Sequence, residues 1–230
     1  MIVFFDLDDT LYDRGMPFLA AAEEFYGGKV ADPRKAYRAC MFRGNEVYLP
    51  SQRGEISMEE MFIYRWRRGF ADVDIKMTTK EALEFQELYR LKKDCISLSP
   101  VIEDMLRCCA EHADGLGIIT NGPSKNQWNK IRCLGLERFM ERNRMIVSGD
   151  VGIDKPDVGI FHIAEQRCNA APKELLFIGD SLENDIAPAI QCGWNTMWLN
   201  RNAHPDDPGI HPDVTVTTEA ALAAALRMQF

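Results

Sequence analysis

The stretch Phe4-Phe5-Asp6-Leu7-Asp8-Asp9-Thr10, close to the first residue, decides the fold of this chain. An apolar run rich in β-branched and aromatic residues leads into it, which predicts a strand buried on both faces in the middle of a parallel sheet. The run ends at a carboxylate, and two more carboxylates follow within the next three residues. Asp6 and Asp8 point the same way if the extended geometry continues, whereas Asp9 points elsewhere.

Three carboxylates crowded at the end of a strand repel one another, so another group must offset their charge. A divalent cation with oxygen ligands is the simplest such group. One carboxylate could then attack an electrophile while its neighbour transfers protons. Asp and Thr are also ordinary turn and N-cap residues, and this stretch by itself is equally compatible with a turn.

The overall composition is that of a globular protein without a basic surplus. The chain has 230 residues, 46% of them hydrophobic and 27% charged, and a net charge of −8 at pH 7. This charge argues against binding to nucleic acid polymers or to anionic membranes. Asp6 interrupts the apolar N-terminus, so we expect no signal peptide, no membrane span and a cytoplasmic location. The seven cysteines lack CxxC spacing, and we interpret them as small buried hydrophobic residues.

Residues 13–97 carry helix signals and no strand pattern. Asp32-Pro33 supplies an N-cap followed by proline at the first helical position. We expect the helix that starts there to end at Tyr48, before a break over residues 50–54. Two later segments with apolar stripes of helical period follow Ser/Thr-x-x-Glu capping boxes. The sequence therefore predicts an all-helical domain over residues 13–97.

After residue 97, helices alternate with short apolar strands. The expected strands are 116–119, 145–147, 175–178, 195–199 and 214–216, and the expected helices include 101–112, 124–133, 156–167 and 183–191. Strands separated by helices of this length imply right-handed crossovers and a parallel sheet covered on both faces. We therefore predict an α/β fold, with a Rossmann-like parallel sheet core over residues 1–12 and 98–230 and the helical domain inserted into it.

Polar residues follow four of the expected strands at their carboxyl ends, where open α/β sheets bind ligands. They are Asp6 and Asp8, Thr120 and Asn121, Lys155, and finally Asp180 and Asp185. The carboxylates suit Mg²⁺, the hydroxyl and backbone donors suit phosphoryl oxygens, and the lysine adds a positive charge. Phosphoryl transfer needs this combination of a nucleophile, a hard metal ion and fixed positive charge.

These residues carry a resemblance to a known family. The segments Asp6-Leu7-Asp8-Asp9-Thr10, Thr120-Asn121-Gly122, Lys155-Pro156, and Gly179-Asp180-Ser181 with Asn184-Asp185 resemble, in order, the four motifs of the haloacid dehalogenase (HAD) superfamily. The resemblance covers the core, and the motifs show no departure from the family pattern. It implies an enzyme that forms an aspartyl-phosphate on Asp6, while Asp8 protonates the leaving oxygen and then activates water.

The same resemblance implies roles for the other motif residues. Thr120, with the backbone N–H of Asn121, would hold the phosphoryl group, and Lys155 would offset the charge on Asp6 and the phosphate. The implied Mg²⁺ ligands are Asp6, the backbone carbonyl of Asp8, Asp180, and Asp185 either directly or through a neighbouring group. Asp9 is expected to be structural.

Three activities compete within such a fold. A dehalogenase does not need a proton-transferring carboxylate two residues after the nucleophile, so Asp8 argues against dehalogenation. A sugar-phosphate mutase related to β-phosphoglucomutase usually reads Asp-x-Asp-Gly, which Asp6-Leu7-Asp8-Asp9 does not match. A non-enzymatic binding protein on the same core would predict a damaged motif. Hydrolysis of a phosphomonoester fits best.

The helical domain follows the first motif directly, which resembles the position of the cap in one subclass of the family. Such a cap excludes water and recognises the leaving group. Candidate substrate contacts near chain breaks are Arg14, Arg43, Tyr48, Gln52 and Arg53, each of which is equally compatible with a solvated helix end.

Segments outside the motifs, from residue 99 to 122 and around residues 198–200 and 212–213, resemble bacterial pyrimidine-nucleotide 5′-nucleotidases. The expected substrate is therefore a small phosphorylated metabolite, first a pyrimidine nucleoside monophosphate and next phosphoglycolate or an acyl-sugar phosphate. The sequence leaves open whether the protein is a monomer or a homodimer.

Overall fold

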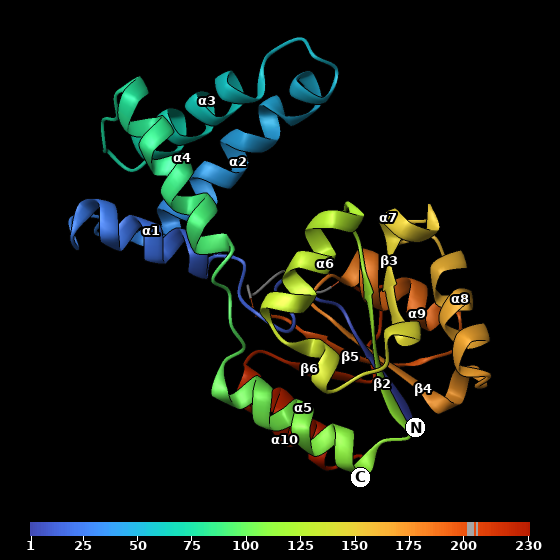
Figure 1. Cartoon of the computed structure of the whole chain (residues 1–230). Helices are drawn as coiled ribbons and strands as arrows, with labels where there is room; N and C mark the ends of the chain where they lie inside the picture. The colour runs from blue at the N-terminus through green and yellow to red at the C-terminus, as the bar shows by residue number, and fades with distance from the viewer. Residues whose placement is uncertain (202–204, 206) are drawn as a thin grey trace. The chain divides into compact units, whose positions relative to one another are not determined.

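The computed structural model describes residues 1–201, 205 and 207–230. These residues divide into two compact units. The α/β unit comprises Met1–Asp13 and Ser97–Phe230, and the helical unit comprises Arg14–Ile96 (Figure 1).

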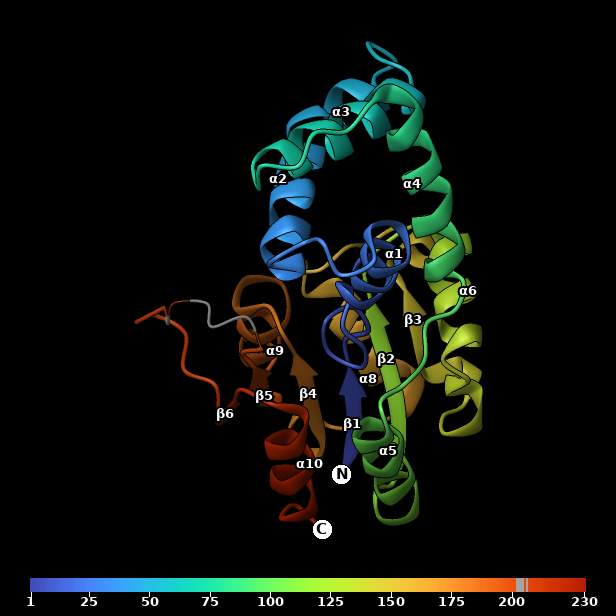
Figure 2. The same cartoon turned by 90° about the vertical axis from the view of Figure 1, so that its left-hand side faces the viewer.

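One parallel sheet forms the centre of the α/β unit. Within the described residues it has six strands in the order β3-β2-β1-β4-β5-β6. The strands are β1 (Ile2–Phe5), β2 (Gly115–Thr120), β3 (Met145–Val147), β4 (Leu175–Gly179), β5 (Asn195–Leu199) and β6 (Val214–Val216). Phe5 at the end of β1 is in register with Ile118 of β2 and Ile178 of β4. The carboxyl ends of these three strands therefore lie at the same edge of the sheet, as the arrowheads in Figure 2 show.

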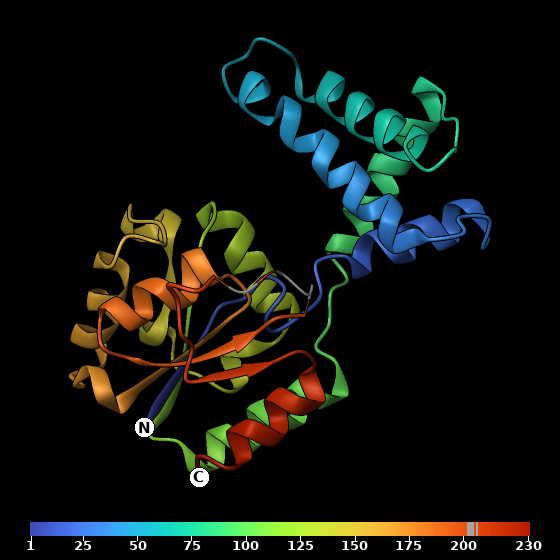
Figure 3. The ribbon, with the colours of Figure 1, turned by 180° about the vertical axis from the view of Figure 1, so that it is seen from behind.

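Helices cover both faces of this sheet, which confirms the predicted fold class. They are α5 (Pro100–His112), α6 (Ser124–Cys133), α7 (Ser148–Val151), α8 (Gly159–Cys168), α9 (Ala187–Gln191) and α10 (Glu219–Arg227). Helices α5 and α10 pack side by side on one face, and α8 and α9 lie on the other (Figures 1 and 3). Phe4 and Phe177 point towards α8, where the rings of Phe161 and Phe177 are 5.1 Å apart. The complete burial of Phe4 explains why β1 reads as a continuous apolar run.

The helical unit has its own aromatic core. Its helices are α1 (Met16–Tyr26), α2 (Pro33–Gln52), α3 (Met58–Ala71) and α4 (Thr79–Lys93). Phe18, Trp66, Phe70 and Phe85 are fully buried against one another. The capping boxes expected before α3 and α4 are present, with Ser57 and Thr78 as the N-cap residues.

Three helix boundaries differ from the expectation. Helix α2 continues through Pro50 to Gln52, because a proline removes only one backbone N–H and that position is already in the last turn. Helix α8 begins at Gly159 and not at Pro156, because Asp157 accepts a hydrogen bond from the Gly159 N–H and forms a turn first. The expected helix over 183–191 is a π-helical turn, Leu182–Ile186, followed by α9.

Two further predictions, one about the cysteines and one about membrane-spanning helices, can also be compared with the structure. All seven cysteines are free, but only Cys40 and Cys109 are buried and Cys95 is exposed, so the interpretation as buried hydrophobic residues holds for part of them. Among the residues that the structure describes, no helix combines the length and the apolar character needed to cross a bilayer.

Candidate active site

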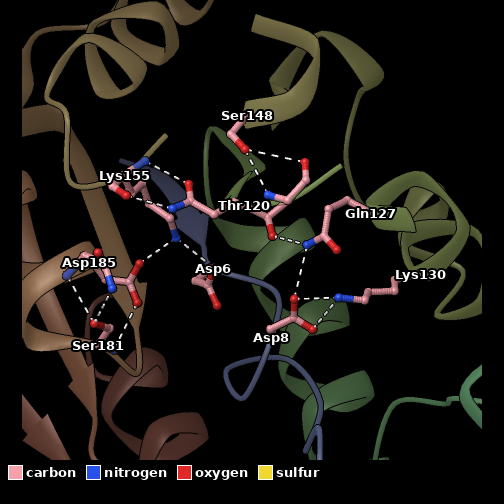
Figure 4. A network of polar contacts seen from close by, with 12 residues as sticks. Asp6, Asp8, Thr120, Gln127, Lys130, Ser148, Lys155, Ser181 and Asp185 are labelled. Carbon is pink, nitrogen blue, oxygen red and sulfur yellow. Dashed lines mark hydrogen bonds and ion pairs between the residues drawn. The ribbon is translucent and has the colours of Figure 1, made fainter. Parts of the chain in front are cut away.

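A group of charges, three of them buried and that of Asp180 partly buried, lies where β1 and β4 end. It consists of Asp6, Lys155, Asp180 and Asp185 and is called the buried charge group below. The Asp6 N–H donates to the Ile178 carbonyl at 2.8 Å, which extends the pairing of β1 with β4 by one residue and fixes the Asp6 backbone. Lys155 Nζ lies 2.7 Å from Asp6 Oδ1 and 2.5 Å from Asp185 Oδ1 (Figure 4). One cation thus bridges two carboxylates inside the protein.

The loop that carries Lys155 is held by the residue after β2. The side-chain amide of Asn121 donates to the Lys155 carbonyl at 2.7 Å, and its oxygen accepts from the Lys155 N–H at 2.8 Å. This pair of hydrogen bonds joins the second and third motifs and points the lysine side chain inward. The side chain of Asn121 therefore positions Lys155. Only the backbone N–H of Asn121 is then left for the phosphate binding that the sequence predicts.

The residues after β4 bring Asp185 back against the end of that strand. A Cβ on Gly179 would collide with the Asp185 side chain, so only glycine allows this approach. The Ser181 N–H donates to Asp185 Oδ2 at 3.0 Å, and the Ser181 hydroxyl caps the π-helical turn by accepting from the Asn184 N–H. The carbonyl of Asp180 accepts from Trp198 Nε1 at 2.8 Å. Oxygen atoms of Asp6, Asp180 and Asp185 lie within 4.8 Å of one another.

The buried charge group holds three carboxylates against one cation, and the pKa values reflect this excess. Burial, followed by repulsion from Asp6 and Asp185, raises the pKa of Asp180 to about 8. Burial also raises the pKa of Asp6 above its ordinary value, although Lys155 opposes the shift. Burial alone would lower the pKa of Lys155, but the attraction of Asp185 and Asp6 outweighs it, so the lysine stays charged.

A second polar group surrounds Asp8 and is called the Asp8 group. It comprises Asp8, Tyr12, Thr120, Gln127 and Lys130. Lys130 Nζ contacts both carboxylate oxygens of Asp8, at 2.8 and 2.6 Å, and the Tyr12 hydroxyl donates to Oδ1. Gln127 Nε2 reaches Asp8 Oδ2 at 3.2 Å and Thr120 Oγ1 at 2.5 Å (Figure 4). Asp8 and Thr120 are thereby connected through one amide.

The structure brings the motif residues of the α/β unit together at one edge of the sheet. Asp9 is not a member of either group, although its negative charge helps to raise the pKa of Asp180; its backbone is left-handed, with a φ of 63°. Gln127, Lys130 and Tyr12 were not singled out in the sequence. The available signal was the spacing of Gln127 and Lys130, three residues apart on a helix that begins shortly after Thr120.

The candidate substrate contacts lie in the helical unit. Arg14 is exposed, and Tyr48 is 52% exposed on α2. Arg53 pairs with Glu55 at 3.1 Å. The guanidinium of Arg43 contacts Asp72 and Glu46, so its donors already have partners. The assignment of Arg14, Tyr48 and Arg53 as substrate contacts therefore stays a prediction.

Comparison with known proteins identifies the family. The family model for haloacid dehalogenase-like hydrolases matches residues 1–193. The chain belongs to this family. The resemblance seen in the four motifs is thereby confirmed, and the protein is a hydrolase.

Among curated HAD relatives, glyceraldehyde 3-phosphate phosphatase from Methanopyrus kandleri is 28% identical over 89% of this chain and 85% of its own length. Phosphoserine phosphatase from Thermus thermophilus is 27% identical over 98% of this chain and 99% of its own length. Pyrimidine 5′-nucleotidase YjjG from Escherichia coli is 36% identical, but over only 45% of either chain. A solved structure, the HAD-hydrolase YfnB from Bacillus subtilis bound to magnesium, shares the fold with a TM-score of 0.68 and 23% identity, covering 98% of this chain and 97% of that one.

Proposed function

We propose that this HAD-family enzyme is a Mg²⁺-dependent phosphatase that hydrolyses a small phosphorylated metabolite through an aspartyl-phosphate on Asp6. The buried charge group is the observation that carries the proposal. Lys155 holds Oδ1 of Asp6, and no donor among the described residues reaches Oδ2. One oxygen of a fixed carboxylate is therefore left to attack a phosphorus atom, next to a cation that offsets the charge of the phosphoryl group.

The donor set of the buried charge group fits a magnesium ion. Oxygen ligands are what Mg²⁺ prefers, and this group contains three carboxylates with a net surplus of negative charge. The raised pKa of Asp180 supports this proposal, because a cation bound there would offset the repulsion between the carboxylates. Asp6, the backbone carbonyl of Asp8, and Asp180 are the proposed ligands. Both oxygens of Asp185 already accept hydrogen bonds, from Lys155 and Ser181, so it contributes mainly its charge. Bound Mg²⁺ would supply charge stabilisation for the phosphoryl oxygens.

The proposed reaction has two steps. In the first, Asp6 attacks phosphorus, the bond from phosphorus to the leaving oxygen breaks, and Asp8 gives that oxygen a proton. In the second, Asp8 takes a proton from water as the water oxygen attacks the phosphorus of the aspartyl-phosphate, which restores Asp6 and releases phosphate. Thr120 would donate to a phosphoryl oxygen. Because Gln127 Nε2 donates to Thr120 Oγ1, the hydroxyl proton of Thr120 is directed elsewhere and can serve this purpose.

The proposed substrate class is supported by the relatives that match most of the chain. Both of those named above are phosphatases of small metabolites, glyceraldehyde 3-phosphate in one case and phosphoserine in the other. We propose that the helical unit acts as the cap that selects among such compounds. Arg14, Tyr48 and Arg53 are its candidate contacts.

A pyrimidine nucleoside monophosphate is the second candidate substrate. It is supported by the 36% identity to the nucleotidase YjjG, which exceeds that to either full-length relative but spans less than half of each chain.

Substitution of the nucleophile tests the activity. Asp6→Asn should lower Mg²⁺-dependent release of phosphate from an aryl phosphate by at least about 10³-fold, because an amide cannot form the acyl phosphate. Asp104→Asn is the matched control, since Asp104 is an exposed carboxylate on α5. Wild-type turnover by Asp6→Asn would show that the nucleophile is assigned wrongly.

A panel of phosphorylated metabolites tests the substrate. It should contain glyceraldehyde 3-phosphate, phosphoserine, UMP, dTMP, purine monophosphates, phosphoglycolate and sugar phosphates, each with Mg²⁺. A clear preference for UMP and dTMP would favour the nucleotidase, and equally poor rates for every nucleotide would exclude it. An isomerised sugar phosphate that appears without free phosphate would identify a mutase.

A further inference from the structure

Two residues of α6, Gln127 and Lys130, point at Asp8 from one face of the helix (Figure 4). They are three positions apart, a spacing that places side chains next to each other on a helix. Lys130 contacts both oxygens of the Asp8 carboxylate. Two contacts from one ammonium group, together with the Tyr12 hydroxyl on Oδ1, fix the rotation of the carboxylate as well as its position.

The orientation of the Gln127 amide is determined by its partners. In the structure Gln127 Nε2 faces Asp8 Oδ2 at 3.2 Å, an orientation that suits the ionised form of Asp8, because an ionised carboxylate only accepts hydrogen bonds. The same nitrogen lies 2.5 Å from Thr120 Oγ1. Gln127 is 2% exposed, so water does not compete for these contacts.

The turn after β2 leaves space for this amide. Gly122 has a φ of 140°, which favours glycine, and a Cβ there would stand 3.2 Å from Gln127 Cγ and Cδ. The turn that carries the second motif and the helix that follows it are therefore packed so that Gln127 reaches between Thr120 and Asp8.

We infer that Gln127 and Lys130 are positioning residues, which hold the proton-transferring carboxylate of Asp8 and the hydroxyl of Thr120 in one fixed arrangement. The inference rests on the proposed function. Neither residue takes part in bond making. Lys130 acts on the alignment of Asp8 with the leaving oxygen, and Gln127 acts on both Asp8 and the direction of the Thr120 hydroxyl proton. Helix α6 thus becomes part of the catalytic apparatus.

Substrates that differ in their leaving group distinguish a positioning role of Gln127 and Lys130 from a purely structural role. Phenol is a much poorer leaving group than 4-nitrophenol, so phenyl phosphate depends more on protonation by Asp8 than 4-nitrophenyl phosphate does. The two substrates have nearly the same shape. The ratio of their kcat/KM values reports enzyme phosphorylation, in which Asp8 is the acid, and it is insensitive to the fraction of folded enzyme.

Lys130→Met is the first variant to measure with the Mg²⁺-loaded full chain. Because a general acid contributes typically about 10²–10⁴-fold, kcat/KM for phenyl phosphate should fall by about tenfold or more, and several times further than for 4-nitrophenyl phosphate. Lys130→Arg, which can contact both carboxylate oxygens, should recover most of the loss. Lys125→Met is the matched control, because Lys125 is an exposed lysine of the same helix.

Gln127→Met tests the link to Thr120. It keeps the size of the side chain and removes the amide, so inhibition by inorganic phosphate should weaken in this variant and stay unchanged in Lys130→Met. An equal loss with both aryl phosphates in Lys130→Met, or no loss, would overturn the inference. The wild-type enzyme distinguishes failure of this inference from failure of the proposed function. If the wild type released phosphate from none of the substrates, the proposed function itself would be wrong.

Discussion

Two lysine–carboxylate groups lie at the same edge of the sheet, and they differ in how far water reaches them. In the buried charge group the side chain of Lys155 is 2% exposed, and those of Asp6 and Asp185 are 9% and 2% exposed. In the Asp8 group the side chains of Lys130 and Asp8 are both 19% exposed. The first group keeps its charges fixed in a low-dielectric environment, where each charge would act strongly on the phosphoryl group of the proposed substrate. The second retains access to water, as a carboxylate must if it is to exchange protons in each turnover.

The largest effect should come from removing the lysine of the buried charge group. Lys155→Met leaves Asp6 and Asp185 buried without their counter-charge. Loss of one partner of a buried ion pair lowers the free energy of unfolding by about 3–5 kcal/mol, and phosphatase activity should fall with it. Urea unfolding at pH 7 in EDTA measures the stability, with Lys173→Met as the exposed control. A change below about 1 kcal/mol would mean that the group is hydrated like a surface pair.

The buried charge group should also make the stability of the metal-free protein depend on pH. The pKa of Asp180 is about 8 in the folded protein, against about 3.9 in an unfolded chain. Between these values the native state binds the additional proton, so the free energy of unfolding of the metal-free protein falls as pH rises from about 4 to about 8. Under the proposed assignment, Mg²⁺ would bind the ionised carboxylate and offset this loss.

Thermal unfolding with Mg²⁺ or EDTA tests this pH dependence. The rise in Tm produced by Mg²⁺ should be small at about pH 5.5 and larger at about pH 8, at about 2–4 °C for each kcal/mol of difference. Asp180→Asn removes the titrating carboxyl, and its Tm in EDTA should vary less over the same range. The same rise in Tm at both pH values in the wild type would contradict the assignment of Asp180 as a ligand.

The more exposed lysine should contribute less to stability. Lys130→Met removes an ion pair whose partners remain partly accessible to water, so the expected loss is about 1 kcal/mol or less. The comparison between Lys130→Met and Lys155→Met in the same urea experiment measures the difference between the two groups directly. Equal losses would show that the Asp8 group is as isolated from water as the buried one.

The proximity of the residues in the buried charge group could be predicted, because the sequence shows where the strands before them end. Asp6 and Asp180 each come after an apolar run, and the order of parallel strands places such residues at one edge. The roles of these residues stay predictions, but their proximity needed only the identification of the strands. The Asp8 group was harder to predict, because Gln127 and Lys130 lie on a helix. Which face of a helix points at the site depends on its packing against the sheet, and a polar spacing of three residues occurs equally on solvated faces.

Two helix boundaries were predicted wrongly because they too depend on contacts between elements. Pro50 predicts a helix end by its missing N–H, yet α2, which packs against α3, continues to Gln52, four residues beyond the expected end at Tyr48. The π-helical turn at Leu182–Ile186 could not be read from the sequence, because its spacing is set by contacts of Asp185 with Gly179 and Lys155. Such turns are frequent at functional sites, where side-chain geometry outweighs regular backbone hydrogen bonding.

The smallest effect is expected at Asp9, the carboxylate of the opening stretch that belongs to neither group. Its φ of 63° is left-handed, a conformation that Asp and Asn tolerate better than other side chains with a Cβ. Its carbonyl accepts from Arg201 Nε at 3.2 Å, an interaction that does not depend on the side chain. Asp9→Asn should therefore change kcat/KM by no more than about threefold, or roughly 0.6 kcal/mol. Asp9→Val, which strains the backbone, should instead lower the free energy of unfolding by about 1–3 kcal/mol. If Asp9→Asn lost activity as severely as Asp6→Asn, the division of the three carboxylates into nucleophile, proton-transfer group and structural residue would be wrong.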